Sequence, residues 1–313
     1  MRIDNTAFSL YMRCPKLYLE RYEAKDFLGQ PDIRRAGVPA GVEESTAKAE
    51  DVKQAAGLLS VLHNGSDAPT VQHTGIERKP DDSSSTGRAF GKRFHELLEN
   101  RHRVQLGLLP RTFRPLVDAK LESEAQSVFA QYEQHWLGDP LRTLGAEAQY
   151  TLPLPGSAHE LTVRIDRIVR FPDGTIGPQD SKTESTPGNN SRENWASRTQ
   201  ASLYLWALEQ LQPKERVSRL VVDVITRGNT KRAPIFYRSD DITRSRADLE
   251  DAIRNVIRVA DEIEHWRGLG WWPSNMNICK DGWKRCDMYD LHVLGRTEGN
   301  LRLYQPAEQY LET

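Results

Sequence analysis

The spacing of apolar residues divides the chain into helical segments, a group of strands and polar connections. Helical spacing predicts helices, which we place at residues 1 to 28, 42 to 63, 89 to 106, 115 to 136, 199 to 211 and 241 to 266. Runs of β-forming residues predict strands, which we place at residues 145 to 153, 160 to 171, 175 to 184, 219 to 226 and 233 to 238. Residues 64 to 86 are polar and rich in helix breakers, which predicts a mobile connection, and residues 29 to 41 predict a loop.

Two of these strands form an acidic hairpin, and residues 161 to 182 read LTVRIDRIVRFPDGTIGPQDSK. If the turn is a three-residue loop with Gly174 in the left-handed conformation, Asp166 lies directly opposite Asp180. Lys182 follows two residues later and points to the same face of the sheet. A two- or four-residue loop would send these charges to opposite faces. The arrangement therefore depends on this one turn.

Paired aspartates suit a divalent cation, because the cation prefers hard oxygen ligands and relieves the repulsion between two carboxylates. A lysine beside the metal can orient a nucleophilic water or stabilise a crowded phosphate. Pro178 removes a ladder donor from the second strand, and we expect a bulge just before Asp180. The alternative interpretation is an exposed hairpin with ordinary surface charge.

The hairpin, which ends in D-x-K, resembles the PD-(D/E)xK nuclease superfamily in its RecB-type exonuclease branch, which includes CRISPR-associated and phage nucleases. Three further segments match this branch in the same order: AFSLYMRCPKLYLERY with Cys14 and Pro15, AFGKRFHELLE with His95, and TQASLYLWALEQL with Gln200 and Tyr204. Together these segments cover the chain almost from end to end. Their order is more specific than any one of them.

The resemblance implies an α/β fold with a central mixed sheet flanked by helices, a restriction-endonuclease-like core, and a helical lobe formed by both termini. We expect an N-terminal helical segment at residues 1 to 86, a nuclease core at residues 87 to 240, and a C-terminal helix and tail at residues 241 to 313 that packs on the N-terminus. The implied activity is metal-dependent hydrolysis of DNA by an exonuclease in phage or bacterial recombination, repair or processing. A recombinase or helicase is the implied partner.

The same resemblance implies a role for each site residue. Mg²⁺ or Mn²⁺ is expected on Asp166 and Asp180, with His95 and the backbone carbonyl of Ser181 as further ligands. Lys182 is expected to hold the attacking water. Gln200 and Tyr204 are expected to position Lys182 or the DNA backbone. The alternative function is a catalytically weak, nuclease-fold module that binds DNA beside a partner protein.

The three cysteines raise a separate question. Many RecB-type exonucleases hold an iron–sulfur cluster on four cysteines, one near the N-terminus and three near the C-terminus. Here the corresponding positions are Cys14, Cys279, Cys286 and His292. Three thiolates and an imidazole can hold zinc, and iron–sulfur centres with a histidine ligand also exist. A structural metal protein built on this set, or three buried cysteines in a reducing cytosol, are the alternatives.

Composition places bounds on these interpretations. The chain has 313 residues, 38% hydrophobic and 28% charged, which is enough for one sizeable core and a smaller lobe. Without a run of 18 apolar residues or a signal peptide, we expect a cytoplasmic protein with no membrane contact. The net charge of −1 argues against nonspecific coating of nucleic acid, although a local groove can be basic. Candidate phosphate contacts, each of which can equally be a solvated surface charge, are Arg93, Arg101, Arg103, Arg111, Arg114, Arg227, Lys231 and Arg232.

Overall fold

The computed structural model describes residues 1–19, 22, 76–78, 82–184, 195–228, 232–275, 277, 279–281, 284–295 and 297–306. The helix predicted at residues 42 to 63 and the loop predicted at residues 29 to 41 lie outside the described residues. The chain divides into two compact units, of which the first consists of Met1–Met12 and Pro80–Trp271. The second consists of Arg13–Lys79 and Trp272–Thr313. The domain boundaries expected at residues 87 and 241 stay predictions.

A six-stranded mixed sheet forms the centre of the first unit. Its strands are β1 (Arg2–Asp4), β3 (Arg142–Pro153), β4 (Glu160–Arg170), β5 (Ile176–Glu184), β6 (Val221–Thr226) and β7 (Ile235–Arg238). The strand order is β1-β4-β5-β6-β7, and β3 also pairs with β4. The β1–β4 and β5–β6 pairs are parallel and the others are antiparallel. The predicted mixed sheet is confirmed, and the five predicted strands correspond to β3 through β7.

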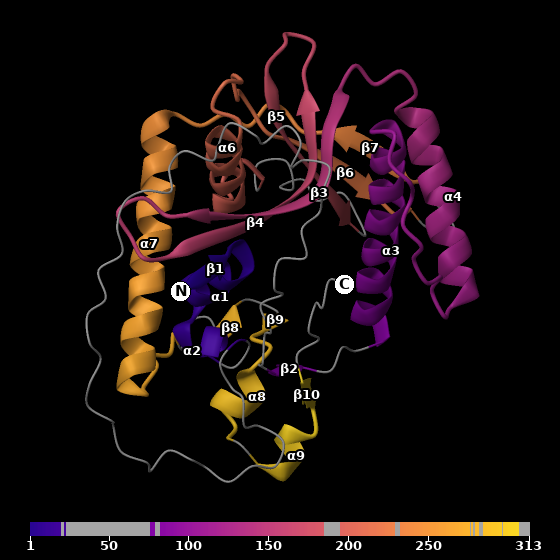
Figure 1. Ribbon diagram of the computed structural model, residues 1–313. Coiled ribbons are helices and arrows are strands. Elements are labelled where there is room, and N and C mark those ends of the chain that lie inside the picture. The colour runs from indigo at the N-terminus through magenta and orange to yellow at the C-terminus, as the bar shows by residue number, and fades with distance from the viewer. Residues whose placement is uncertain are drawn as a thin grey trace. The chain divides into compact units, whose positions relative to one another are not determined.

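Helices cover both faces of this sheet (Figure 1). The helices of the first unit are α1 (Asn5–Arg13, which reaches into the second unit by one residue), α3 (Asp82–Gln105), α4 (Ala119–His135), α6 (Thr199–Leu211) and α7 (Arg246–Leu269). In Figure 1, α3 and α4 lie on one side of the sheet, and α6 and α7 lie on the other. Apolar residues of α3 and α4, such as Phe94 and Val128, pack with Ile225 of β6 in one buried cluster. Burial of these faces drives the assembly of the layers.

The second unit contains short elements from both ends of the chain. They are α2 (Pro15–Tyr18), β2 (Ile76–Arg78), β8 (Lys280–Asp281), β9 (Lys284–Arg285), α8 (Tyr289–His292), α9 (Glu298–Leu301) and β10 (Tyr304–Pro306). Strands β2 and β10 pair antiparallel, although they lie far apart in the sequence. The ring of Tyr18 stacks on Trp272 with centroids 5.6 Å apart, and Lys16 N–H donates to Pro273 O at 3.2 Å. The two terminal segments therefore form this unit together.

The structure corrects several predicted boundaries. The segment predicted as one helix from residue 1 begins with strand β1, where buried Ile3 alternates with partly exposed neighbours, and its helix is interrupted at Cys14 before Pro15. Helix α7 begins at Arg246, not at residue 241, because Ser245 caps it in a capping box with Asp248. Of the connection expected over residues 64 to 86, the described residues belong to β2 and to the start of α3, and residues 64 to 75 and 79 to 81 lie outside the described residues.

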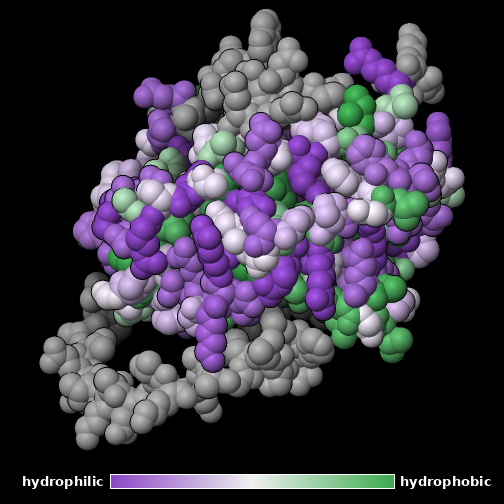
Figure 2. All heavy atoms as spheres, turned by 90° about the horizontal axis from the view of Figure 1, so that it is seen from above, coloured by the Kyte–Doolittle hydropathy of each residue, from purple (hydrophilic) through white to green (hydrophobic). Residues whose placement is uncertain are grey.

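Hydrophilic side chains cover most of the molecular face shown in Figure 2, and hydrophobic residues gather there in a few small patches. Among the described residues, no helix has the length and apolar character needed to cross a membrane.

Candidate active site

The hairpin turn between β4 and β5 has the predicted three-residue geometry. Gly174 has a φ of 84°, and Phe171 N–H donates to Thr175 O at 2.9 Å across the loop. A residue with a side chain rarely adopts this left-handed conformation, which explains the glycine. The ladder then pairs Arg167 with Gln179 and runs past Pro178 without a change of register. The predicted register is therefore confirmed, and the bulge predicted at Pro178 is wrong.

Strands β4 and β5 separate just beyond this ladder. Their pairing ends at Arg167 and Gln179, and the same edge of β4 pairs with β1 only at Glu160–Thr162. In the gap between these two ladders, Asp166 Oδ2 accepts a hydrogen bond from the backbone N–H of Ser181 at 2.9 Å. The register places Asp166 opposite Asp180, so the separation of the strands opens space beside two carboxylates.

Asp180 and Lys182 form a close ion pair on this side of the sheet. Lys182 Nζ lies 2.7 Å from Asp180 Oδ2, and the Asp180 side chain is almost completely buried. Burial raises the pKa of Asp180 to about 7, Lys182 opposes this shift, and Asp166 adds to it. Burial alone would lower the pKa of Lys182, but Asp180 and Asp166 raise it, so the ammonium stays charged. Asp180 Oδ1 is buried and has no hydrogen-bond partner among the described residues.

Glu147 on β3 is a third carboxylate that sequence reasoning missed. The β3–β4 ladder pairs Ala146 with Arg167 and Ala148 with Ile165, which sets Glu147 opposite Asp166. Glu147, Asp166 and Asp180 thus form a row across three neighbouring strands, which we call the carboxylate row. The backbone of Glu147 has a φ of 46°, and Arg164 Nε donates to its Oε2 at 2.9 Å. Burial and the neighbouring Asp166 raise the pKa of Glu147 to about 8.

His95 reaches the carboxylate row from helix α3. A close approach of this helix to β5 positions it, since a Cβ on Gly91 would lie 2.8 Å from Thr183 Oγ1. His95 Nδ1 lies 3.7 Å from Asp166 Oδ2, and its ring also hydrogen-bonds with the Ser181 backbone. Desolvation lowers the pKa of His95, which favours the neutral imidazole that coordinates metals.

These side chains form a metal-binding arrangement. Among the described residues, one group of three or more histidine, cysteine or acidic side chains brings its ligand atoms within 4.8 Å of one another, and it consists of His95, Glu147 and Asp166. Asp180 stands next to Asp166 in the carboxylate row, and its buried Oδ1 has no hydrogen-bond partner in the part of the chain that the structure describes. Hard oxygen donors and one imidazole suit Mg²⁺ or Mn²⁺.

Helix α6 carries the two remaining predicted site residues, Gln200 and Tyr204. Gln200 Nε2 donates to Tyr204 OH at 2.8 Å, so the two side chains are joined to each other. Burial raises the pKa of Tyr204 well above its ordinary value, and the nearby Asp180 and Asp166 add to the effect. Tyr204 therefore lies near the carboxylate row, with Gln200 bonded to it, and their role there stays a prediction.

Comparison with protein families matches residues 71–281 to the PD-(D/E)XK nuclease superfamily. The chain belongs to this superfamily. Its members are nucleases, that is, hydrolases of phosphodiester bonds, and they generally use Mg²⁺ or Mn²⁺. No curated protein matches the sequence. Among solved structures, one titled "Crystal structure of SSO0001" is 16% identical, with a TM-score of 0.28, and the match covers 55% of this chain and 74% of that one.

Most of the arginines that the sequence suggested as phosphate contacts are bonded to carboxylates or carbonyls of the protein itself. Arg93 is buried and bonds to Glu122 and Glu96. The other partners are Glu133 for Arg101, the Leu109 carbonyl for Arg103, Glu99 for Arg111 and Glu124 for Arg227. These pairs hold elements together, so we do not assign the five arginines to the substrate. Arg114 and Arg232 are exposed, and Lys231 lies outside the described residues.

The three cysteines are buried in the second unit, and none of them forms a disulfide bond. Cys286 N–H donates to Cys279 O at 2.9 Å, and Asn275 N–H donates to Cys14 Sγ at 3.4 Å. Burial and the Cys14 thiol raise the pKa of Cys279, and burial is also the main cause of the raised pKa of Cys286. The thiols are thus near enough to influence one another. His292 lies on α8 of the same unit and is partly exposed.

Proposed function

We propose that the protein is a divalent-metal-dependent deoxyribonuclease. The observation that carries this proposal is the carboxylate row with Lys182 and His95 at its two sides, placed where β4 and β5 separate. A phosphodiester hydrolase needs a cation to neutralise the negative charge of its substrate and a group to hold the attacking water. The chain supplies both kinds of group within one superfamily fold.

Asp166, Asp180, Glu147 and His95 would hold the cation, with the Ser181 carbonyl as a further oxygen donor. The fit rests on the ligand atoms of His95, Glu147 and Asp166, which lie within 4.8 Å of one another. It also rests on the buried Oδ1 of Asp180, which has no hydrogen-bond partner within the described ranges. A bound Mg²⁺ or Mn²⁺ supplies positive charge for the scissile phosphate and the leaving oxygen, and lowers the pKa of a bound water.

Lys182 would orient the attacking water and stabilise the phosphate as charge accumulates. Its pKa is raised, so it acts as a fixed cation and not as a base at neutral pH. Asp180 holds the ammonium at 2.7 Å and thereby fixes its direction. The joined pair of Gln200 and Tyr204 would limit the motion of Lys182 or support the DNA backbone.

The finer assignment is an exonuclease that acts on DNA ends in recombination, repair or processing, beside a helicase or recombinase. It rests on the resemblance to RecB-type nucleases. The catalytically weak module remains the second candidate, but the presence of His95, Asp166, Asp180 and Lys182 argues against it.

End-labelled single- and double-stranded DNA, incubated with Mn²⁺, Mg²⁺ or EDTA, tests both levels of this proposal. We expect shortening from labelled ends with either cation and none with EDTA. Covalently closed circular DNA is the control, because an exonuclease leaves it intact while an endonuclease opens it. No cleavage of any DNA with either cation would contradict the nuclease assignment.

We also propose that Cys14, Cys279, Cys286 and His292 hold an iron–sulfur cluster or a zinc ion. The burial of the three thiols in the unit that joins both ends of the chain supports a clamp of this kind. Cys286→Ser should then lower the melting temperature and loosen the N-terminal helix. Metal analysis after purification without oxygen, together with melting of both proteins, provides the test. Absence of stoichiometric iron and zinc, with unchanged melting, would contradict the centre and leave the nuclease proposal intact.

A further inference from the structure

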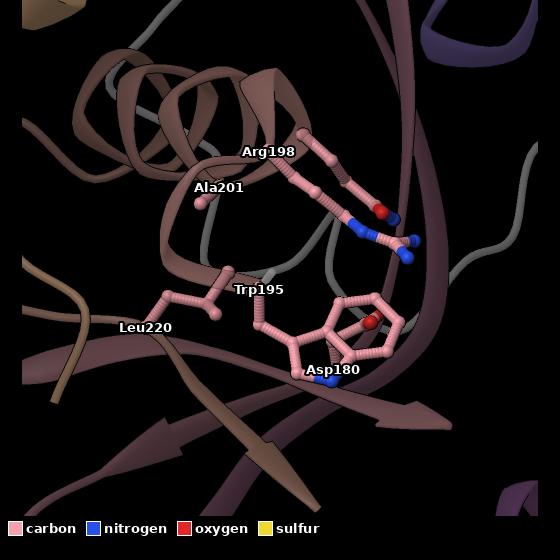
Figure 3. Close-up of a pocket in the computed structure, with 6 residues that line it drawn as sticks. Asp180, Trp195, Arg198, Ala201 and Leu220 are labelled. Atoms are coloured by element: carbon pink, nitrogen blue, oxygen red, sulfur yellow. The ribbon is translucent and has the colours of Figure 1, made fainter. Parts of the chain in front are cut away.

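A small pocket opens beside the carboxylate row, on the side of helix α6 (Figure 3). The residues that line it are Asp180, Trp195, Arg198, Gln200, Ala201 and Leu220. Two buried polar atoms of the lining, Asp180 Oδ1 and the indole nitrogen of Trp195, have no hydrogen-bond partner among the described residues. Buried polar atoms without partners are uncommon in native proteins, and a ligand with polar groups would satisfy them.

Arg198 provides the positive charge of this pocket. Its guanidinium lies 3.8 Å from the centroid of the Trp195 ring, and Figure 3 shows the Arg198 side chain beside this ring, with Asp180 behind the ring. Among the described residues, the Arg198 guanidinium has no hydrogen-bond or ion-pair partner, and it is exposed near Lys182 and Glu184. This distinguishes Arg198 from Arg93 and Arg227, whose guanidinium groups are bound to carboxylates.

The backbone around Arg198 is held in place. Trp195 is only 7% exposed, and Arg198 N–H donates to its carbonyl at 3.3 Å. Arg244, just before α7, bonds to the Ala196 carbonyl and to Ser202 Oγ, and so ties this turn to the first turns of α6. Stacking on a buried ring restricts the guanidinium further, so less entropy is lost when it binds a ligand.

We propose that Arg198, supported by Trp195, binds a backbone phosphate next to the scissile phosphate. The inference rests on the proposed nuclease function and names a substrate contact for the same site. Arg198 Cζ lies 3.8 Å and Lys182 Nζ lies 5.7 Å from the centroid of the Trp195 ring, so both positive charges contact the same indole. A planar guanidinium with free donors matches phosphate oxygens in a bidentate manner. The acidic carboxylate row beside it needs such a cation to tolerate a polyanionic strand.

The affinity of Arg198→Ala for single-stranded DNA tests this contact. Binding is measured by fluorescence anisotropy in Ca²⁺, in a Lys182→Ala background that does not cut. We expect a loss of about tenfold, which corresponds to one charged hydrogen-bonding contact. The slope of log K against log salt should fall by about 0.7, the value for one phosphate on a single strand. Arg246→Ala, at an exposed arginine of α7 that pairs with Glu250, is the matched control and should change neither quantity.

Oligonucleotides with one neutral methylphosphonate locate the phosphate. In the Lys182→Ala background, the substitution should weaken binding at one position beside the scissile phosphate. The Arg198→Ala protein should bind this oligonucleotide as tightly as it binds the unmodified one. Trp195→Phe should retain most of the affinity, and Trp195→Leu should lose part of it through the freed guanidinium.

The outcomes separate this inference from the nuclease proposal. If the wild-type protein cuts DNA but Arg198→Ala binds with unchanged affinity and salt slope, the contact is refuted and the nuclease function stands. Equal penalties at every methylphosphonate position in both proteins would refute it as well. If the wild-type protein neither cuts nor binds DNA, both proposals fail.

Discussion

The two faces of the central sheet both bury charged side chains, but they balance them differently. On the side of α3 and α4, Asp223 accepts hydrogen bonds from Tyr132 at 2.8 Å, Gln179 at 2.5 Å and Arg238 at 2.6 Å. Arg238 also binds Asp139, which lies 3.6 Å from Arg167. Two carboxylates thus face two guanidinium groups, and the hydrogen bonds of the network are largely satisfied. We call this group the Asp223 network.

The carboxylate row occupies the opposite orientation of the same strands. Side chains alternate along a strand, so Asp166 and Asp180 point away from Arg167 and Gln179. Three carboxylates meet the cations Arg164 and Lys182, and Asp180 Oδ1 has no hydrogen-bond partner among the described residues. The pKa values of Asp180 and Glu147 are raised. A network whose hydrogen bonds and charges are balanced stabilises a fold. A cluster whose negative charge exceeds the positive charge beside it can bind a cation. We therefore assign a structural role to the Asp223 network and a catalytic role to the carboxylate row.

The largest expected effect is loss of cleavage in Asp180→Ala. Removal of a carboxylate from the row eliminates a proposed metal ligand, while relief of repulsion leaves the metal-free fold intact or more stable. Cleavage of labelled DNA in Mg²⁺ and urea unfolding are measured on the same preparation. A variant that cuts at the wild-type rate would contradict the site.

Lys182→Ala should lose turnover far more than metal affinity. The lysine is assigned to the water and the phosphate, and loss of a charge-stabilising group costs about two to four orders of magnitude in rate, or about 3 to 5 kcal/mol. Single-turnover cleavage and Mn²⁺ calorimetry separate the two quantities. Failure of the variant to bind Mn²⁺ would show that the division of roles is wrong.

Asp223→Ala should destabilise the protein by about 3 to 5 kcal/mol, because it leaves Arg238 and Gln179 without their buried acceptor. Urea unfolding measures the change, and Asp223→Asn, which keeps one acceptor oxygen, should lose less. Cleavage by the fraction that remains folded should persist. An equal loss of stability in Asp180→Ala would remove the distinction between the two faces.

The smallest predicted effect is a pH dependence of stability. Asp180 and Glu147 have folded-state pKa values of about 7 and about 8, above their unfolded values near 4, so the folded protein binds more protons over this interval. The metal-free protein should therefore lose stability as the pH rises from about 4 to about 8, by an amount on the order of a few kcal/mol. Mn²⁺ should restore it, most strongly at pH 8, since the cation replaces the protons.

Thermal unfolding at pH 5.5 and pH 8, with Mn²⁺ or EDTA, measures this dependence. Asp180→Asn is the matched control, because its amide does not titrate, and it should flatten the curve. Identical curves for the two proteins would show that Asp180 does not titrate in this interval.

The sequence by itself determined the hairpin and its register. A Pro-Asp-Gly turn needs only neighbouring residues to select a three-residue loop, so Asp166, Asp180 and Lys182 were placed on one face by local geometry. Helix α6 was also predicted at its observed bounds, Thr199–Leu211, from the resemblance of this segment to RecB-type nucleases, and the spacing of its apolar residues agrees with a helix.

Only the tertiary structure decided the remaining partners. Glu147 joins the row through the register of β3 with β4, and an irregularity between Thr143 and Gly145 shifts that register in a way that no local pattern announces. Likewise, Arg93 and Arg227 looked like substrate contacts until α4 supplied Glu122 and Glu124 as their partners. A turn is specified by adjacent residues, but the partner of a charge is specified by whatever distant element packs against it.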